Sequence, residues 1–190
     1  MDLKSAFDTV NRDKLWQIME KHSLGKKLII RIKELYKETA CKIEVDEKQS
    51  NIFWTNKGLR QGCPLSPLLF AIYIADYEKI LREAQDGGIM VGRTKVHTLA
   101  YADDMVIMAE TATQMKEMMK TTNKYLTCRN LKLNSEKFKV VVFRKGSKEG
   151  KREEWKRNNE SIEEVEGFEY FGYLFNRNNN PTRHIKGVYS

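Results

Sequence analysis

The sequence has few of the residues from which covalent or metal cross-links are made. It contains three cysteines, Cys41, Cys63 and Cys128, and three histidines in 190 residues. The number of cysteines is odd and no two stand at the two-residue spacing of zinc sites, which argues against a disulfide framework and against a structural zinc centre. We therefore expect the protein to work in a reducing compartment rather than a secretory one.

Long apolar runs are also lacking. The longest, Leu68 to Ala75, is far shorter than the roughly 20 residues that a membrane-spanning helix needs. At the amino terminus Met1 is followed by Asp2 and further polar residues, so the basic-then-apolar pattern of a secretory signal is absent. We expect a soluble, intracellular protein of the nucleus or cytoplasm with no membrane partner.

The residues that are abundant indicate a packed and basic domain. Hydrophobic residues make up 41% of the sequence, which suffices for one core at this length. Lys and Arg outnumber Asp and Glu by 34 to 26, which gives a net charge of +8. Because a basic chain attracts polyanions over long distances, nucleic acid is the leading partner class. The alternative is a basic surface that serves solubility alone.

Helix-like and strand-like patterns are interspersed along the chain. Apolar residues with helical spacing mark residues 13–22, 28–36, 67–84 and 115–126. Strand-like patterns mark residues 41–45, 52–55, 96–101, 105–109, 139–143 and 168–175. Residues 144–166 are rich in charged residues and are expected to form a loop, and residues 177–190 a poorly ordered tail. This mixture predicts an α+β fold.

Two acidic clusters stand in unusual surroundings. Asp103 and Asp104 join two apolar strand-like runs, which predicts that they lie at the tip of a β-hairpin, and Asp2 and Asp8 bracket an apolar pair. Adjacent carboxylates repel each other unless a cation neutralises them. Oxygen ligands without His or Cys favour Mg²⁺ or Mn²⁺, and two such ions can promote phosphoryl transfer. For an isolated Asp-Asp pair, the commoner role is simply to cap a turn.

Five ordered segments carry a resemblance to a known family. They are DLKSAFD (residues 2–8), RQGCPLSP (residues 60–67), YADD (residues 101–104), LKLNSEK (residues 131–137) and FEYFGY (residues 168–173). In this order they resemble the reverse transcriptases, specifically the LINE-type, non-LTR branch of that family. The last two segments resemble its fourth motif and its primer-grip hairpin. Phe138 and Phe171 depart from the pattern, since a small hydroxyl residue and Leu are more usual there.

The resemblance implies the fold of a polymerase palm, an antiparallel sheet backed by helices, over residues 1–176. Members of the family also have fingers before the first motif and a thumb after the primer grip. The chain has little room for either, so we expect a truncated palm from which fingers and thumb are largely missing. Another chain that supplies fingers or thumb would be a partner consistent with this expectation.

The resemblance also assigns roles to individual residues. Asp2, Asp103 and Asp104 are the expected ligands of two Mg²⁺ or Mn²⁺ ions, and together with Lys137, which would act on the departing pyrophosphate, they form the expected catalytic set. The residues expected beside the incoming nucleotide are Phe7, Arg60, Gln61 and Gly62.

Simple chemistry agrees with three of these roles but allows plainer ones. Phe7 could crowd a ribose 2′-hydroxyl, or be an ordinary core phenylalanine. Gln61 and Gly62 offer an amide donor beside backbone that a ligand can approach closely, or an ordinary turn. Lys137 could equally be a solvated lysine.

The activity implied by the resemblance is template-directed DNA synthesis, with an RNA template, a DNA primer and deoxynucleotides as partners. A primer 3′-hydroxyl would attack the α-phosphate of a deoxynucleotide with the help of two metal ions. The alternative is a catalytically inactive retrotransposon remnant that retains at most nucleic-acid binding, so the sequence leaves enzymatic activity of this chain open. An RNA-directed RNA polymerase shares the acidic hairpin but fits Phe7 and Gln61 less well.

Overall fold

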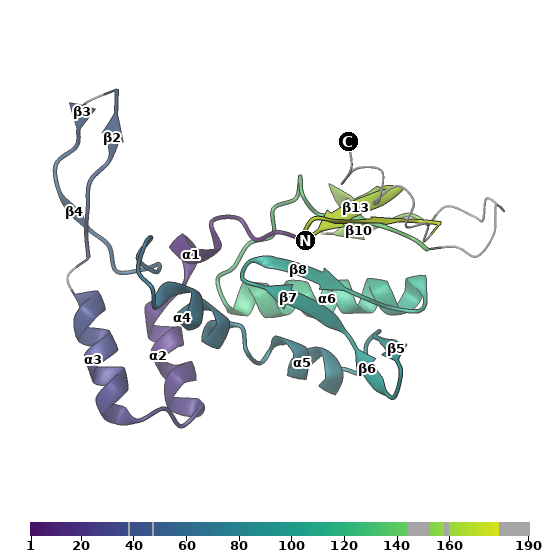
Figure 1. The fold of residues 1–190 in the computed structure, drawn as a ribbon, viewed down its shortest axis with the longest axis horizontal. Helices are drawn as coiled ribbons and strands as arrows, with labels where there is room; N and C mark the ends of the chain where they lie inside the picture. The colour runs from purple at the N-terminus through teal and green to yellow at the C-terminus, as the bar shows by residue number, and fades with distance from the viewer. Residues whose placement is uncertain (38, 47, 144–152, 158–159, 179–190) are drawn as a thin grey trace. The chain divides into compact units, whose positions relative to one another are not determined.

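The computed structural model describes residues 1–37, 39–46, 48–143, 153–157 and 160–178 (Figure 1). Contacts divide the chain into a larger unit, Leu3–Leu133, and a smaller unit, Met1–Asp2 with Asn134–Ser190. Helices and short strands occur together, which confirms the α+β expectation. The domain limits of 1–176 and 177–190 stay predictions, and the expected tail lies outside the described residues from 179 onward.

The larger unit begins with three helices, α1 (Ala6–Thr9), α2 (Arg12–Lys21) and α3 (Lys26–Lys37). The side chain of Asn11 fixes the start of α2, because it accepts a hydrogen bond of 2.9 Å from the backbone nitrogen of Lys14. α2 and α3 run as antiparallel neighbours, as Figure 1 shows, with Leu15 and Ile29 among their buried residues. The helices expected at residues 13–22 and 28–36 are thereby confirmed.

A long hairpin follows α3. Its strands are β1 (Ala40–Cys41), β2 (Glu44–Val45), β3 (Lys48–Gln49) and β4 (Phe53–Trp54), paired β1 with β4 and β2 with β3. β1, β2 and β4 overlap the strand-like patterns expected over residues 41–45 and 52–55, and β3 lies in the polar stretch between those two ranges. The hairpin is thinly packed, and the Trp54 side chain is 66% exposed.

The single helix expected over residues 67–84 is two helices, α4 (Ser66–Tyr73) and α5 (Tyr77–Glu83). The carbonyl of Tyr73 accepts a hydrogen bond of 2.7 Å from Arg129, and the Arg129 guanidinium also pairs with the carboxylate of Asp76. The backbone nitrogen of Tyr77 turns instead to the carbonyl of Ile74 at 3.0 Å. A side chain from a distant part of the sequence therefore holds the break.

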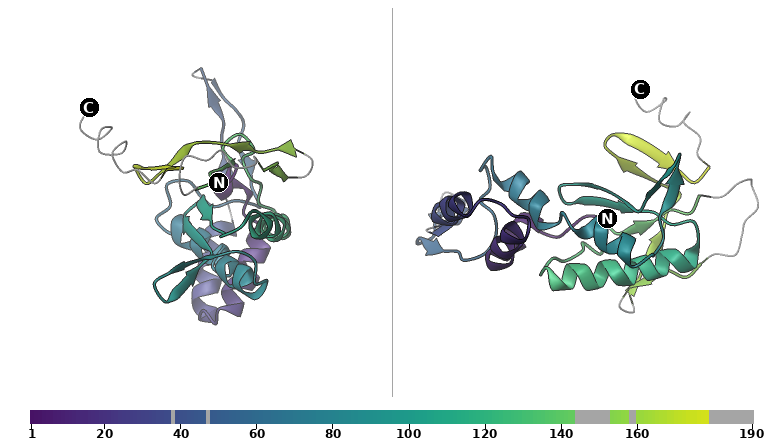
Figure 2. Two further views of the ribbon diagram at one scale, coloured as in Figure 1. Left: turned by 90° about the vertical axis from the view of Figure 1, so that its right-hand side faces the viewer. Right: turned by 90° about the horizontal axis from the view of Figure 1, so that it is seen from below.

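The rest of the larger unit consists of two hairpins and a long helix. These elements are β5 (Ile89–Val91), β6 (Thr94–Val96), β7 (Thr98–Tyr101), β8 (Asp104–Ile107) and α6 (Ala112–Cys128). A capping box between Thr111 and Gln114 begins α6. α6 lies along α5, as Figure 2 also shows, and the rings of Tyr77 and Tyr125 meet at 4.9 Å between them. Met118 is fully buried, so the methionines of this helix serve as core residues.

The smaller unit corrects the expectation of a loop over residues 144–166. Its strands are β9 (Lys139–Val140), β10 (Lys156–Arg157), β11 (Glu160–Ser161), β12 (Glu163–Glu164), β13 (Gly167–Tyr170) and β14 (Tyr173–Asn176). Three of them lie in the expected loop, where Trp155 and Ile162 are buried at 4% and 9% exposure. These two apolar side chains give the charged segment a core, and residues 144–152 and 158–159 of the segment lie outside the described residues.

The described strands pair two by two rather than in one antiparallel sheet. Each spans two to four residues, and β9 pairs with β12 in parallel while the other pairs are antiparallel. Leu3 contributes only an isolated bridge to Leu133 rather than a strand. With such short strands, no described strand gains a second neighbour. Within the part of the chain that the structure describes, every helix is too short or too polar to span a bilayer.

Candidate functional site

The acidic pair lies at the tip of the β7–β8 hairpin, as the sequence predicts. Tyr101 pairs with Asp104, so Ala102 and Asp103 form the turn. Ala102 has a φ of 52°, a left-handed conformation that costs a residue with a side chain about 1 kcal/mol. Met105 is buried at 1% exposure, which anchors the hairpin in the core. The core therefore holds the strand while its tip faces outward.

The negative charges of Asp103 and Asp104 are not balanced by any described side chain. Asp103 is half-buried and Asp104 is exposed. Among the described residues, neither carboxylate has a hydrogen-bond or ion-pair partner. A hard divalent cation would bind to the oxygen atoms of two such carboxylates and neutralise their charge.

Asp2, in the smaller unit, is held by two residues of the LKLNSEK segment. Its Oδ2 accepts a hydrogen bond of 3.2 Å from Nδ2 of Asn134 and lies 3.4 Å from Nζ of Lys137. Its carbonyl accepts a further bond of 2.9 Å from the backbone nitrogen of Asn134. The structure thus brings together two residues predicted for catalysis, Asp2 and Lys137. It adds Asn134, which was quoted in the motif but given no role.

The three expected metal ligands belong to different units, Asp2 to the smaller one and the Asp103-Asp104 pair to the larger one. In the described ranges no group of three or more His, Cys, Asp or Glu side chains is gathered closely enough to hold an ion. Mg²⁺ usually takes only one or two protein carboxylates and completes its shell with water and substrate phosphates. The carboxylate chemistry of these residues fits that ion.

Phe7 lies on α1 with its ring stacked on the ring of Phe70 at 4.9 Å. Phe70 is fully buried, whereas Phe7 is half-buried and keeps part of its ring accessible. The carbonyl of Phe7 accepts a hydrogen bond of 2.8 Å from the backbone nitrogen of Leu59. The chain leading into the RQGCPLSP segment therefore runs directly beside Phe7.

Gln61 reaches back to the first motif. Its Nε2 donates to Oδ1 of Asp8 across 3.4 Å, and both side chains are exposed. Gly62 has a φ of 75°, and a Cβ at that position would meet no atom within 4 Å. A left-handed glycine beside open space leaves this backbone accessible to a ligand. Asp8 is a partner for Gln61 that the sequence analysis did not identify.

Arg60 is bound to the neighbouring helix and turn. Its guanidinium lies 5.6 Å from the centre of the Tyr36 ring, and its Nε donates to Oγ1 of Thr39 at 3.3 Å. Its carbonyl accepts a bond of 2.6 Å from the hydroxyl of Ser66, which closes the turn at the start of α4. These contacts fix the backbone conformation of the RQGCPLSP segment on both sides of Gln61.

Arg12 supports the same region from beneath. It is buried at 7% exposure and donates to the carbonyls of Gly58, Tyr36 and Thr55 at 2.8, 3.1 and 2.8 Å. Its burial lowers the pKa of the guanidinium. No acidic partner is found for it among the described residues, so the carbonyls and the Tyr36 ring, whose centre lies 5.1 Å from the guanidinium carbon, compensate this cation. The sequence offered no signal for this role beyond an arginine at the first position of a helix.

The aromatic segment FEYFGY forms the β13–β14 hairpin. Phe171 and Gly172 occupy its turn, both with positive φ, as a two-residue turn of this kind requires. The rings of Phe168 and Phe175 stack at 5.0 Å across the two strands. The hairpin expected over residues 168–175 is thus confirmed, while its likeness to a primer grip stays a prediction.

Comparisons with known proteins agree with the motifs. The family model described as reverse transcriptase (RNA-dependent DNA polymerase) matches residues 1–175. The chain is 28% identical over 137 residues to the retrovirus-related Pol polyprotein from type-1 retrotransposable element R2 of Popillia japonica, which covers 72% of this chain. It is 28% identical over 138 residues to the Pol polyprotein of element R2DM of Drosophila melanogaster, which again covers 72% of this chain.

A third relative comes from a vertebrate. The chain is 25% identical over 135 residues to the transposon TX1 uncharacterized 149 kDa protein of Xenopus laevis, which covers 70% of this chain. In these three relatives the matched part spans 23%, 13% and 10% of their own length. The likeness therefore concerns one portion of much longer proteins.

Proposed function

Because this chain belongs to the reverse transcriptase family, and is homologous over part of its length to the Pol proteins of R2 and TX1 non-LTR retrotransposons, we propose that it carries the nucleotidyl-transfer site of an RNA-directed DNA polymerase. Its substrates would be an RNA template, a DNA primer and deoxynucleotides. The observation that carries the proposal is the pair of uncompensated carboxylates at the β7–β8 tip.

In this proposal Asp2, Asp103 and Asp104 hold two Mg²⁺ or Mn²⁺ ions. When bound, such ions activate the attacking 3′-hydroxyl and neutralise the charge that develops on the phosphate. Asn134 keeps the Asp2 carboxylate oriented, since it donates to Oδ2 from its side chain. Lys137 already lies 3.4 Å from that same oxygen and would be available to the departing pyrophosphate.

The incoming nucleotide would lie against the surface that Phe7, Gln61 and Gly62 form. One face of the Phe7 ring stacks on Phe70, and the other face would contact the sugar of the nucleotide. There the ring would clash with a ribose 2′-hydroxyl. The exposed amide of Gln61 and the open backbone of Gly62 offer hydrogen bonds to the nucleotide. Arg60 and Arg12 keep the segment in place through the contacts described above.

The proposed fold is that of a polymerase palm, in which the β7–β8 hairpin would present its acids to the primer end. Fingers and thumb would come from another part of the parent polyprotein or from a second chain. The alternative function is an inactive remnant that binds nucleic acid through its basic surface, which the net charge of +8 favours.

The test is primer extension by the purified chain on an RNA template with deoxynucleotides and Mg²⁺. Asp103→Asn is compared with Asp46→Asn, because Asp46 is also an aspartate in a hairpin turn, the one between β2 and β3. We expect the original chain and Asp46→Asn to extend the primer and Asp103→Asn to lose activity by a hundredfold or more. Equal activity in both variants would remove Asp103 from the mechanism. No extension by any of the three proteins, beside an active control enzyme, would leave the remnant as the better account.

A further inference from the structure

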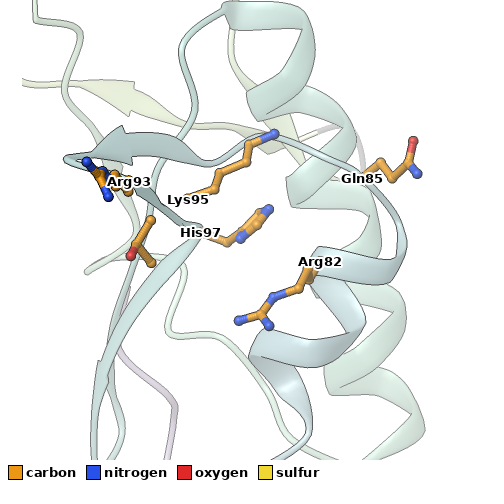
Figure 3. A pocket seen from close by; sticks show the side chains of 6 residues that line it. Arg82, Gln85, Arg93, Lys95 and His97 are labelled. Atoms are coloured by element: carbon orange, nitrogen blue, oxygen red, sulfur yellow. The ribbon is translucent and has the colours of Figure 1, made fainter.

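A basic pocket lies at the end of the β7–β8 hairpin opposite to Asp103. It encloses about 580 Å³ between α5 and the β5–β6 hairpin and is lined by Arg82, Gln85, Arg93, Thr94, Lys95 and His97. Figure 3 shows the ring of His97 between the side chains of Lys95 and Arg82, with Arg93 on the hairpin to one side. Neither the five motifs nor the comparisons assign these residues a role.

The charge of the lining is entirely positive. Arg82 is partly compensated by Glu78, whose Oε1 lies 4.0 Å away. Arg93 and Lys95 form no ion pair with any described residue, and both are exposed. Two further acids lie close in sequence to the lining residues: Glu83 is paired with Lys79 at 3.6 Å, and Asp86 accepts a hydrogen bond of 2.7 Å from Thr121. The pocket therefore presents two uncompensated cations at its rim.

His97 adds a buried imidazole to the lining of the pocket. It is 2% exposed, lines the pocket, and its Nδ1 makes no hydrogen bond within the described residues. That Nδ1 lies 3.4 Å from Oε1 of Glu78. Gly88 keeps room beside the other ring nitrogen, because a Cβ there would come within 3.0 Å of Nε2. A buried imidazole with an acid behind it can donate from Nε2 to a bound oxyanion.

We propose that this pocket binds a phosphate group of a nucleic-acid backbone, outside the polymerase site. Arg93 and Lys95 would pair with the phosphate charge from the rim, and His97 would donate to one oxygen from the floor. The inference rests on the proposed nucleic-acid substrates but not on catalysis by Asp103.

The open and exposed rim favours a backbone over a small anion. A free phosphate gains most from a closed pocket that removes it from water, whereas a polyanion gains from cations that it can reach while most of it stays solvated. The two cations on one short hairpin suit neighbouring phosphates of a strand. Such contacts position nucleic acid without reading its sequence.

The experiment measures binding of labelled single-stranded RNA to the full chain by fluorescence anisotropy at several salt concentrations. The variant R93A/K95A removes the rim cations, and K26A/K27A is the charge-matched control, because Lys26 and Lys27 are exposed on α3. We expect R93A/K95A to bind several-fold more weakly. Its slope of log affinity against log salt should be shallower by about 0.7 to 1.4, which corresponds to one or two phosphates on a single strand. K26A/K27A should keep the original slope, and circular dichroism checks that all variants are folded.

Equal losses in R93A/K95A and K26A/K27A would show a general charge effect and overturn the pocket. Titration with inorganic pyrophosphate separates the two sources of phosphate. Saturable pyrophosphate binding that R93A/K95A loses, with unchanged RNA affinity, would make the pocket a small-anion site and overturn the backbone assignment. A chain that binds no RNA at all would contradict the proposed function as well. If the chain binds RNA but does not extend a primer, the proposed function fails while the proposal about the pocket stands.

Discussion

Nε2 of Gln61 donates to Oδ1 of Asp8 across 3.4 Å, and this bond joins the RQGCPLSP segment to the DLKSAFD segment. The two side chains are far apart in the sequence, yet the backbones beside them are also bonded, from Leu59 to the carbonyl of Phe7. The amide proposed to face the nucleotide is therefore oriented by Asp8, an acid outside the set proposed to hold the metal ions.

Replacing Asp8 with Ala should weaken nucleotide binding more than it slows the chemical step. The long, exposed bond contributes little to stability, so we expect the KM for deoxynucleotide to rise a few-fold with a smaller change in kcat. Steady-state primer extension measures both constants. Asp8→Asn keeps an acceptor oxygen and should stay close to the original protein, as should Asp13→Ala on the exposed side of α2. An unchanged KM in Asp8→Ala would show that this bond does not orient Gln61.

Replacing Phe7 with Val should relax the discrimination between deoxyribonucleotides and ribonucleotides. The smaller side chain leaves room for a 2′-hydroxyl, so we expect the preference for deoxynucleotides to fall by about tenfold or more. The ratio of kcat/KM for the two nucleotide classes measures it. Phe70→Leu is the control, because it disturbs the same ring stack from the buried side. If both variants discriminate equally well, Phe7 is a core residue and nothing more.

Arg12→Ala should destabilise the larger unit strongly. The change removes hydrogen bonds to three carbonyls, of which those of Gly58 and Tyr36 are buried, and it opens a cavity at a buried side chain, so we expect the free energy of unfolding to fall by about 3 kcal/mol. Arg12→Lys keeps the charge but not the planar group and should fall in between. Urea denaturation measures the loss. Arg31→Ala, an exposed α3 residue paired only with Glu34, should cost less than about 0.5 kcal/mol, and an equal cost in both variants would refute the buried role.

The protein should lose stability as the pH rises above about 10. Burial raises the pKa of Tyr77 and of Tyr125 well above the usual value for a phenol, which is about 10. Above that pH the unfolded chain releases protons that the folded chain keeps, so the free energy of unfolding falls with pH, whereas below it these groups add no pH dependence. Tyr77→Phe removes one ionisable group and should reduce the fall between pH 10 and 11.5, measured by urea denaturation at each pH. A fall of the same slope in Tyr77→Phe would assign the alkaline loss to other groups.

The parts of the site that the sequence predicted are those built from neighbouring residues. The acidic hairpin needs only two apolar runs and a short turn, and the aromatic hairpin at Phe171 and Gly172 needs only a turn that accepts positive φ. Both patterns are local, so periodicity and turn chemistry suffice to place them.

The features that the sequence did not predict depend on distant contacts. The contact of Asn134 with Asp2 spans 132 positions, and the anchoring of Arg12 on Gly58 spans 46. The basic pocket combines an α5 residue with a hairpin that was not recognised, because Gly92 and Arg93 form its turn within a short and partly charged segment. No window along the sequence contains both sides of such a contact.

The interaction of Arg129 with Tyr73 and Asp76 also sets an order for folding. The bend between α4 and α5 depends on a guanidinium that lies 53 to 56 positions further along the chain. During synthesis the two helices emerge well before that side chain does, and closing so long a loop has an entropic cost that local helix formation does not. We therefore expect the nascent segment from Ser66 to Glu83 to stay straighter or frayed until α6 has formed and Arg129, at its carboxyl end, reaches Tyr73 and Asp76.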